Sequence, residues 1–111
     1  MKIGILMTTS PEHQNGQTVC ALTEAFLAAS HQVRLFLMDD GIYHIVKNNE
    51  IGAAEKLRSL LSAQMTVSIC SQSAQKRGIA EADTLHGAGW FSQHELAHIV
   101  ADTDRFLSFT N

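Results

Sequence analysis

The side chains best suited to chemistry in this sequence are a cysteine at position 70, a second cysteine at position 20 and a His-Glu-x-x-His pattern near the end. Residues 65–69 have the pattern of a short buried strand, and the residues after Cys70 that of a short helix closed by Gly78. A thiol at such a junction lies at the carboxyl end of a strand, where open α/β sheets bind ligands. Amide groups at the start of a helix favour the thiolate form. Position alone supports equally well a small apolar side chain packed at the end of the strand.

The other groups near the two thiols do not add an activating partner. Lys76 and Arg77 lie at the far end of the predicted helix, and Arg77 is about 10 Å along the axis from Cys70. Two cations there are better explained by the negative end of the helix dipole. Cys20 falls inside a predicted helix over residues 17–30, with no histidine spaced to activate it. We therefore interpret Cys20 as a packed structural thiol, and nothing in the sequence supports a disulfide between the two cysteines.

The segment His94-Glu95-Leu96-Ala97-His98 matches the zinc-protease pattern, in which two histidines hold the metal and the glutamate acts as a base. A third ligand is needed, and only 13 residues follow His98. The predicted apolar stripe of this helix is Leu96, Ile99, Val100 and Thr103. The two histidines lie nearly opposite that stripe, so we expect them to face outward without catalytic zinc. Metal binding through His94 and His98 remains a weaker alternative.

Three further segments are open to two interpretations. Asp39–His44 follows a predicted strand and could line a crevice with an acid, a phenol and an imidazole, although its Asp and Gly residues favour a simple turn. Gly87–Phe91 is predicted to be a loop whose two aromatic rings either pack on the core or contact a partner. The hydroxyl-rich segment Thr8–Glu12 is similar to flavodoxin phosphate loops, but it is acidic and no glycine-rich phosphate motif follows. We therefore expect no organic cofactor.

Composition narrows the class of protein. The 111 residues fit a single domain over residues 1–111, and 45% are hydrophobic, which is enough for a core. The net charge is −3 and no run of basic residues exists, so we expect neither direct nucleic-acid binding nor membrane binding. The first residues lack the length and cleavage site of a signal peptide, which predicts a cytoplasmic protein with reduced thiols.

Apolar runs alternate with helical patterns along the chain, as in a βαβ series. The predicted strands are Lys2–Met7, Val33–Met38, Met65–Ile69, Thr84–His86 and Arg105–Phe109. The longer predicted helices cover residues 17–30, 51–63 and 92–101. This order predicts a three-layer α/β/α sandwich around a mostly parallel sheet of about five strands.

Several segments together carry a family resemblance over nearly the whole chain. They are Lys2–Leu6, His31–Tyr43, Val67–Cys70, Lys76–Ile79 and Asp104–Phe109. The most specific is the cysteine followed eight residues later by Gly78. On these residues the sequence resembles the DsrE/DsrF-like sulfur-relay proteins, which include the TusD subunits of tRNA thiolation. The leucine- and glycine-rich helix usual near the end is replaced here by the His94–His98 stretch, so the resemblance makes that motif a chance match.

The resemblance implies a DsrE-like fold and a catalytic role for Cys70. In sulfur-carrying members the cysteine at this position accepts a persulfide sulfur, which implies sulfurtransferase-like exchange between donor and acceptor proteins and an exposed thiol. It also implies a homotrimer or homohexamer, in which Trp90 and Phe91 are candidate contact residues. Some relatives lack the cysteine and act as structural subunits, so a non-catalytic scaffold stays as the alternative function.

Overall fold

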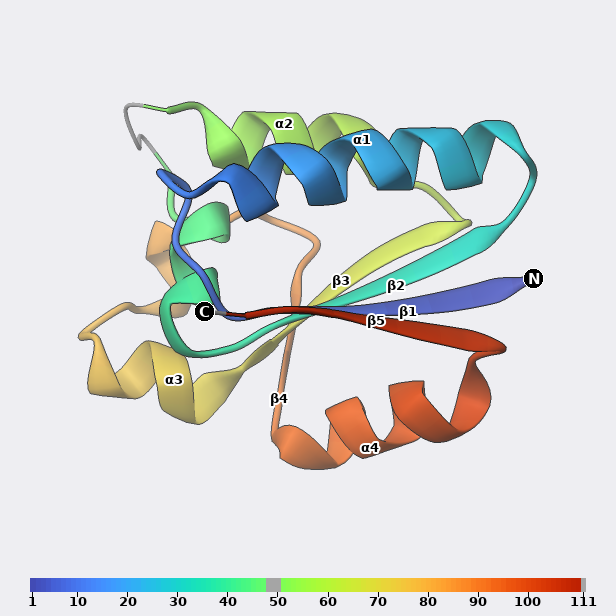
Figure 1. The fold of residues 1–111 in the computed structure, drawn as a ribbon. Helices are drawn as coiled ribbons and strands as arrows, with labels where there is room; N and C mark the ends of the chain where they lie inside the picture. Colours follow the sequence, from blue (N-terminus) through green and yellow to red (C-terminus); the bar gives the residue numbers. More distant parts are fainter. Residues whose placement is uncertain (48–50, 111) are drawn as a thin grey trace.

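The computed structural model describes residues 1–47 and 51–110, which form a single five-stranded sheet with helices on both faces (Figure 1). The strands are β1 (Lys2–Met7), β2 (Gln32–Leu37), β3 (Met65–Cys70), β4 (Gly89–Phe91) and β5 (Arg105–Phe109). The α-helices are α1 (Gln14–Ala28), α2 (Ala53–Leu60), α3 (Ser71–Lys76) and α4 (Gln93–Asp102), and two 3-10 helices are η1 (Asp39–Ile45) and η2 (Glu81–Asp83). The three-layer sandwich predicted from the sequence is confirmed.

The sheet has the strand order β4-β3-β2-β1-β5, and every neighbouring pair is parallel. The chain builds outward from β1 through β2 and β3 to β4 and then returns to the other side of β1. The carboxyl ends of all five strands therefore share one edge of the sheet. The order reverses at β1, and the loop after a strand at such a point borders the crevice where this class of sheet binds ligands.

The two faces of the sheet are packed differently. Helices α1 and α2 cover one face and α3 and α4 the other (Figure 1). The larger hydrophobic cluster contains the aligned row Ile5, Leu35 and Val67, all at most 2% exposed. Because side chains alternate along a strand, the neighbouring residues belong to the opposite face. There a smaller cluster forms around Phe36, Cys70 and Ile99.

Helix α4 packs directly on the backbone of β1. A Cβ atom added to Gly4 would lie 2.7 Å from Cγ2 of Ile99 and 2.9 Å from Cδ1 of Phe106, closer than such atoms approach. The absence of a side chain at Gly4 thus lets Ile99 reach the sheet, where it is 1% exposed. Among the described residues, no helix is both long and apolar enough to cross a bilayer.

The largest differences from the sequence prediction concern the fourth strand and helix α1, and α2 (Ala53–Leu60) is also shorter than the predicted helix 51–63. The fourth strand is Gly89–Phe91, where a loop was expected, and the predicted strand at residues 84–86 is wrong because Thr84 makes only a single antiparallel bridge to Val46. Pairing with β3 outweighs the low strand propensity of glycine. Helix α1 begins at Gln14 rather than at Gln17, because a turn at Ser10–His13 leads straight into it.

Candidate functional site

Long-range hydrogen bonds tie together the loops at the carboxyl edge of the sheet. The buried ring of His44 in η1 bonds through Nε2 to the carbonyl oxygen of Thr9, at 2.9 Å. The backbone N–H of Asp39 donates to Oγ of Ser73 in α3, at 3.0 Å. The segments that follow β1, β2 and β3 therefore form one connected edge.

Cys70 lies where the sequence placed it, at the last position of β3 and directly before α3. Its exposure is not as predicted, because the residue is only 1% exposed. Cys70 aligns with Phe91 of β4, and its side chain points to the face covered by α4. It packs with Phe36 and Ile99, and the half-buried side chains of Met38 and Leu96 pack against the same cluster. The expectation of an exposed thiol is therefore wrong for this conformation.

Arg77, just beyond the end of α3, is engaged with groups other than Cys70. Arg77 makes an ion pair with Asp40 of η1, with 2.9 Å between Nη2 and Oδ1. Its Nη1 also donates to the carbonyl oxygen of Ser73, at 3.1 Å. This last bond satisfies a carbonyl at the end of α3, in agreement with the interpretation of Arg77 as a partner of the helix terminus. Cys70 itself packs in the apolar cluster with Phe36 and Ile99.

The turn between β2 and η1 is strained and fixed in place. Asp39 has a φ of +50°, a left-handed conformation that aspartate tolerates better than most residues. The Ser73 hydroxyl accepts the Asp39 N–H, and the next residue, Asp40, is held by Arg77. The segment is therefore more than the simple turn expected, because it attaches η1 to the helix that follows Cys70.

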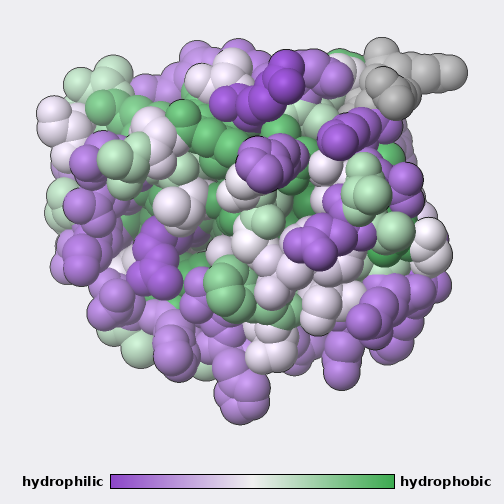
Figure 2. Space-filling model, turned by 180° about the vertical axis from the view of Figure 1, so that it is seen from behind, coloured by the Kyte–Doolittle hydropathy of each residue, from purple (hydrophilic) through white to green (hydrophobic). Residues whose placement is uncertain are grey.

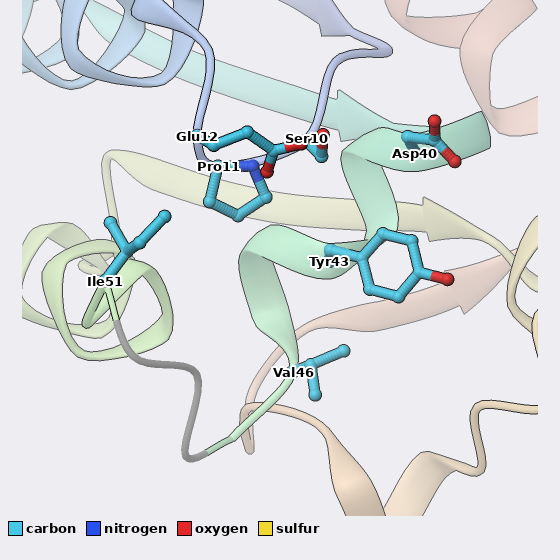
Figure 3. A pocket seen from close by; sticks show the side chains of 7 residues that line it. All are labelled: Ser10, Pro11, Glu12, Asp40, Tyr43, Val46 and Ile51. Atoms are coloured by element: carbon cyan, nitrogen blue, oxygen red, sulfur yellow. Dashed lines mark hydrogen bonds between the residues drawn. The ribbon is translucent and has the colours of Figure 1, made fainter.

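Two adjoining cavities lie along this edge, next to the loop after β1. The first has a volume of about 600 Å³ (Figure 3). It is lined by Ser10, Pro11, Glu12, Asp40, Tyr43, Val46 and Ile51. The second, of about 540 Å³, shares Pro11 and Ile51 with the first and extends between α1 and α2. Cys70 lines neither cavity, so the structure separates the predicted nucleophile from the predicted crevice.

The first cavity is polar on its loop side. Figure 3 shows Ser10, Pro11 and Glu12 on the loop after β1, with Asp40 and Tyr43 contributed by η1. The Ser10 hydroxyl donates a hydrogen bond to Oε1 of Glu12, which lowers the pKa of that carboxyl group. The acid and the phenol proposed from the sequence thus do line a cavity, whereas the imidazole of His44 lines the neighbouring one.

Cys20 lines the second cavity, opposite α2. It is half-buried and packs against the larger hydrophobic cluster, which agrees with its interpretation as a packed thiol. Burial raises the pKa of its thiol above the usual value. Across the same cavity, Lys56 of α2 bonds to Glu24 of α1, with 2.5 Å between Nζ and Oε1. Both cysteines are free thiols.

His44 gives the fold a pH dependence. Burial lowers its pKa below the usual value, so the folded protein binds the proton less readily than the unfolded chain does. We expect the free energy of unfolding to fall as the pH drops below about 6.5, the usual histidine value, and to stop falling once the folded-state pKa is passed. Urea midpoints measured between about pH 5 and 8 test this.

The matched variants for that measurement are His44→Gln and His86→Gln. A glutamine amide at position 44 can still donate to the Thr9 carbonyl but does not titrate, so its midpoint should be flatter over this range than that of the parent. His86 is exposed, and its substitution controls for loss of an imidazole elsewhere. Equal slopes for the two variants would show that His44 is not the group responsible.

The two histidines of the His-Glu-x-x-His pattern lie on the exposed side of α4, as the helical spacing predicted. Within residues 1–47 and 51–110, no group of three or more His, Cys, Asp or Glu side chains is placed to hold a metal ion. Of the two carboxylates that follow His98 in the sequence, Asp102 is paired with Arg34 and Asp104 accepts a hydrogen bond from the backbone N–H of Lys2. His94 and His98 therefore lie on a solvent-facing surface of α4.

The known proteins to which this chain is similar match it along nearly its whole length. A family model for the DsrE/DsrF-like family matches residues 1–109. The crystal structure of the YchN protein from E. coli superposes with a TM-score of 0.78 at 23% identity, over 98% of this chain and 99% of that one. MTH1491 from Methanobacterium thermoautotrophicum, described as a protein of unknown function, gives a TM-score of 0.76 at 14% identity, over 96% of this chain and 97% of that one.

A curated relative is similar in sequence along its full length. The uncharacterized protein MJ0989 of Methanocaldococcus jannaschii is 25% identical over 115 residues, which cover 98% of this chain and 100% of that protein. The structural neighbours establish the arrangement of strands and helices, and the family model covers the same span in sequence. On this evidence the chain belongs to the DsrE/DsrF-like family.

Proposed function

We propose that this protein is a sulfur carrier that accepts a sulfane sulfur on Cys70 and passes it to an acceptor cysteine. The observation that carries the proposal is the position of Cys70. β3 ends and α3 begins at this residue, on the carboxyl edge of the sheet, where sheets of this class bind ligands. The family to which the chain belongs is linked in general to sulfur relay, which makes a thiol at this edge the natural carrier.

The reaction is a thiol exchange without net oxidation. The Cys70 thiolate attacks the outer sulfur of a donor persulfide, R–S–SH. A new sulfur–sulfur bond forms at Cys70 while the bond between the two donor sulfurs breaks, and the donor leaves as the thiolate R–S⁻, which takes up a proton from water. A second exchange, in which an acceptor thiolate attacks the outer sulfur on Cys70, regenerates the thiol. Neither step needs a metal or an organic cofactor, and both suit the reducing cytoplasm.

A non-catalytic scaffold subunit is the second candidate function. The observation that favours it is the burial of Cys70, at 1% exposure among apolar side chains. A free cysteine in such a place commonly acts as a small hydrophobic residue rather than as a nucleophile. The two functions differ in one measurable property, which is whether Cys70 takes up sulfur in the folded protein.

The test is intact-mass analysis after incubation with glutathione persulfide. We expect the parent protein and Cys20→Ser to gain one sulfur atom, and Cys70→Ser to gain none while keeping the parent's circular dichroism spectrum. The serine substitution changes little volume, and an unchanged spectrum would show that the loss of sulfur does not reflect loss of the fold. If the folded parent gains no sulfur, or if Cys70→Ser gains as much as the parent, the carrier function is refuted and the scaffold function takes its place.

We further propose that the chain acts as a homo-oligomer, either a trimer or a hexamer. Strand β4 lies at one edge of the sheet, where its Phe91 is 45% exposed and its Trp90 half-buried. Seen from behind, hydrophobic and near-neutral residues cover much of the middle of the surface, with hydrophilic residues among and around them (Figure 2). Light scattering is expected to give a multiple of the 12.2 kDa chain mass, and a monomer at micromolar concentration would contradict this.

A further inference from the structure

Helix α4 runs from the carboxyl edge of the sheet, where Cys70 lies, back to the amino edge. It begins directly after β4, whose residue Phe91 is aligned with Cys70. It ends at Asp102, and the backbone of Asp104 just beyond bonds to Lys2, the first residue of β1. The N-terminal half of α4 is therefore level with Cys70, and the C-terminal half is level with the start of β1.

The C-terminal half of α4 is firmly attached to the sheet. Ile99 fills the space above Gly4 and is the only α4 residue buried in the described structure. Asp102 pairs with Arg34 of β2 at 3.1 Å. The Asp104 backbone N–H donates to the Lys2 carbonyl at 2.7 Å, and its Oδ2 accepts the Lys2 N–H at 2.8 Å.

The N-terminal half of α4 is attached far more weakly. Gln93 and His94 are exposed, and Leu96 is only half-buried where it packs against the Cys70 cluster. The Ser92 hydroxyl accepts the His94 N–H, a bond that caps the helix and does not reach the sheet. In the part of the chain that the structure describes, no hydrogen bond or ion pair joins residues 93–96 to any strand.

We propose that α4 is a hinged cover over Cys70. Its N-terminal half, carrying Leu96, lifts from the sheet while the Ile99–Asp104 end stays in place, and this exposes the thiol to a persulfide donor or to the acceptor. In the closed position the apolar cluster shields the sulfur on Cys70 from thiols in solution. The inference rests on the proposed sulfur-carrier function and explains how a buried cysteine serves it.

The physical basis is the small amount of structure that such an opening disrupts. Lifting one turn of helix breaks the packing of Leu96 and leaves the five-stranded sheet intact, so the opening costs much less than global unfolding. Local opening exposes little surface and therefore depends little on urea, whereas global unfolding has the full urea dependence. The two routes to an exposed Cys70 can thus be separated without any sulfur chemistry.

The experiment measures the rate at which N-ethylmaleimide labels Cys70 in a Cys20→Ser background, across urea concentrations below the unfolding transition. We expect labelling of the folded protein with a nearly flat urea dependence. Leu96→Ala should speed labelling about tenfold, because it removes the main contact holding the cover closed. The matched control is Leu27→Ala, a half-buried leucine of α1 that packs against the other cluster and should leave the flat rate unchanged.

Labelling that follows the urea dependence of global unfolding would refute the cover, as would Leu96→Ala labelling no faster than Leu27→Ala. These outcomes are independent of sulfur loading. Fast, urea-independent labelling without sulfur uptake would support the cover and refute the carrier function. Sulfur uptake combined with labelling only through global unfolding would support the carrier function and refute the cover.

Discussion

Replacing Gly41 with alanine is expected to lower the free energy of unfolding by about 3 kcal/mol. Gly41 lies in the first turn of η1, against the end of β1. A Cβ atom at this position would lie 2.2 Å from the carbonyl oxygen of Met7 and 3.0 Å from its carbonyl carbon. Both atoms belong to the backbone of a central strand, so neither can rotate away as a side chain would.

The consequence of that clash would extend along the carboxyl edge. To relieve it, η1 must move from the end of β1, and it carries Asp40 and Tyr43 of the first cavity with it. The same movement strains the bond between His44 and Thr9. Urea unfolding followed by circular dichroism measures the effect.

The control for this prediction is Gly78→Ala. Gly78 has a φ of +67° but no atom within 4 Å of an added Cβ, so alanine there meets backbone strain alone, about 1 kcal/mol. If Gly41→Ala is no less stable than Gly78→Ala, the close approach between η1 and β1 is not the constraint that the distances indicate.

Much of the architecture could be predicted because strand and helix patterns depend on neighbouring residues. Lys2–Met7 and Arg105–Phe109 have the predicted bounds, since both are short apolar runs between clear turns. Gly89–Phe91 was missed because its strand exists only through pairing with Ser68–Cys70, some 20 residues away in sequence. Local propensity contains no information about that partner.

The burial of Cys70 could not be predicted for a related reason. Alternation along β3 places Val67 and Ile69 on one face and Ser68 and Cys70 on the other. The sequence alone gives the alternation but not the element that covers the second face. That element is α4, whose packing depends on a side chain absent at Gly4 and on a single fully buried residue, Ile99. The predicted stripe was too wide, because Val100 is 50% exposed.

The second large effect is expected for Phe36→Ala, which should destabilise the fold by about 4 kcal/mol. Phe36 is fully buried on β2, at the centre of the cluster that contains Cys70 and Ile99. Truncation removes a ring that neither the sheet nor α4 can move to replace, so a void remains between them. The matched control is Phe26→Ala, which removes the same ring from a half-buried residue of α1 that packs against the other cluster, and it should cost about 2 kcal/mol or less.

Phe36→Ala also distinguishes two ways of reaching Cys70. Because its ring belongs to the cluster that holds both Ile99 and Leu96 of α4, its loss brings global unfolding closer, and N-ethylmaleimide labelling of Cys70 should become steeply urea-dependent. Leu96→Ala should speed labelling with a flat urea dependence, since it loosens only the turn of α4 that packs against the Cys70 cluster. The same urea dependence for both variants would mean that α4 detaches as one unit, and that its two ends differ less in attachment than their contacts indicate.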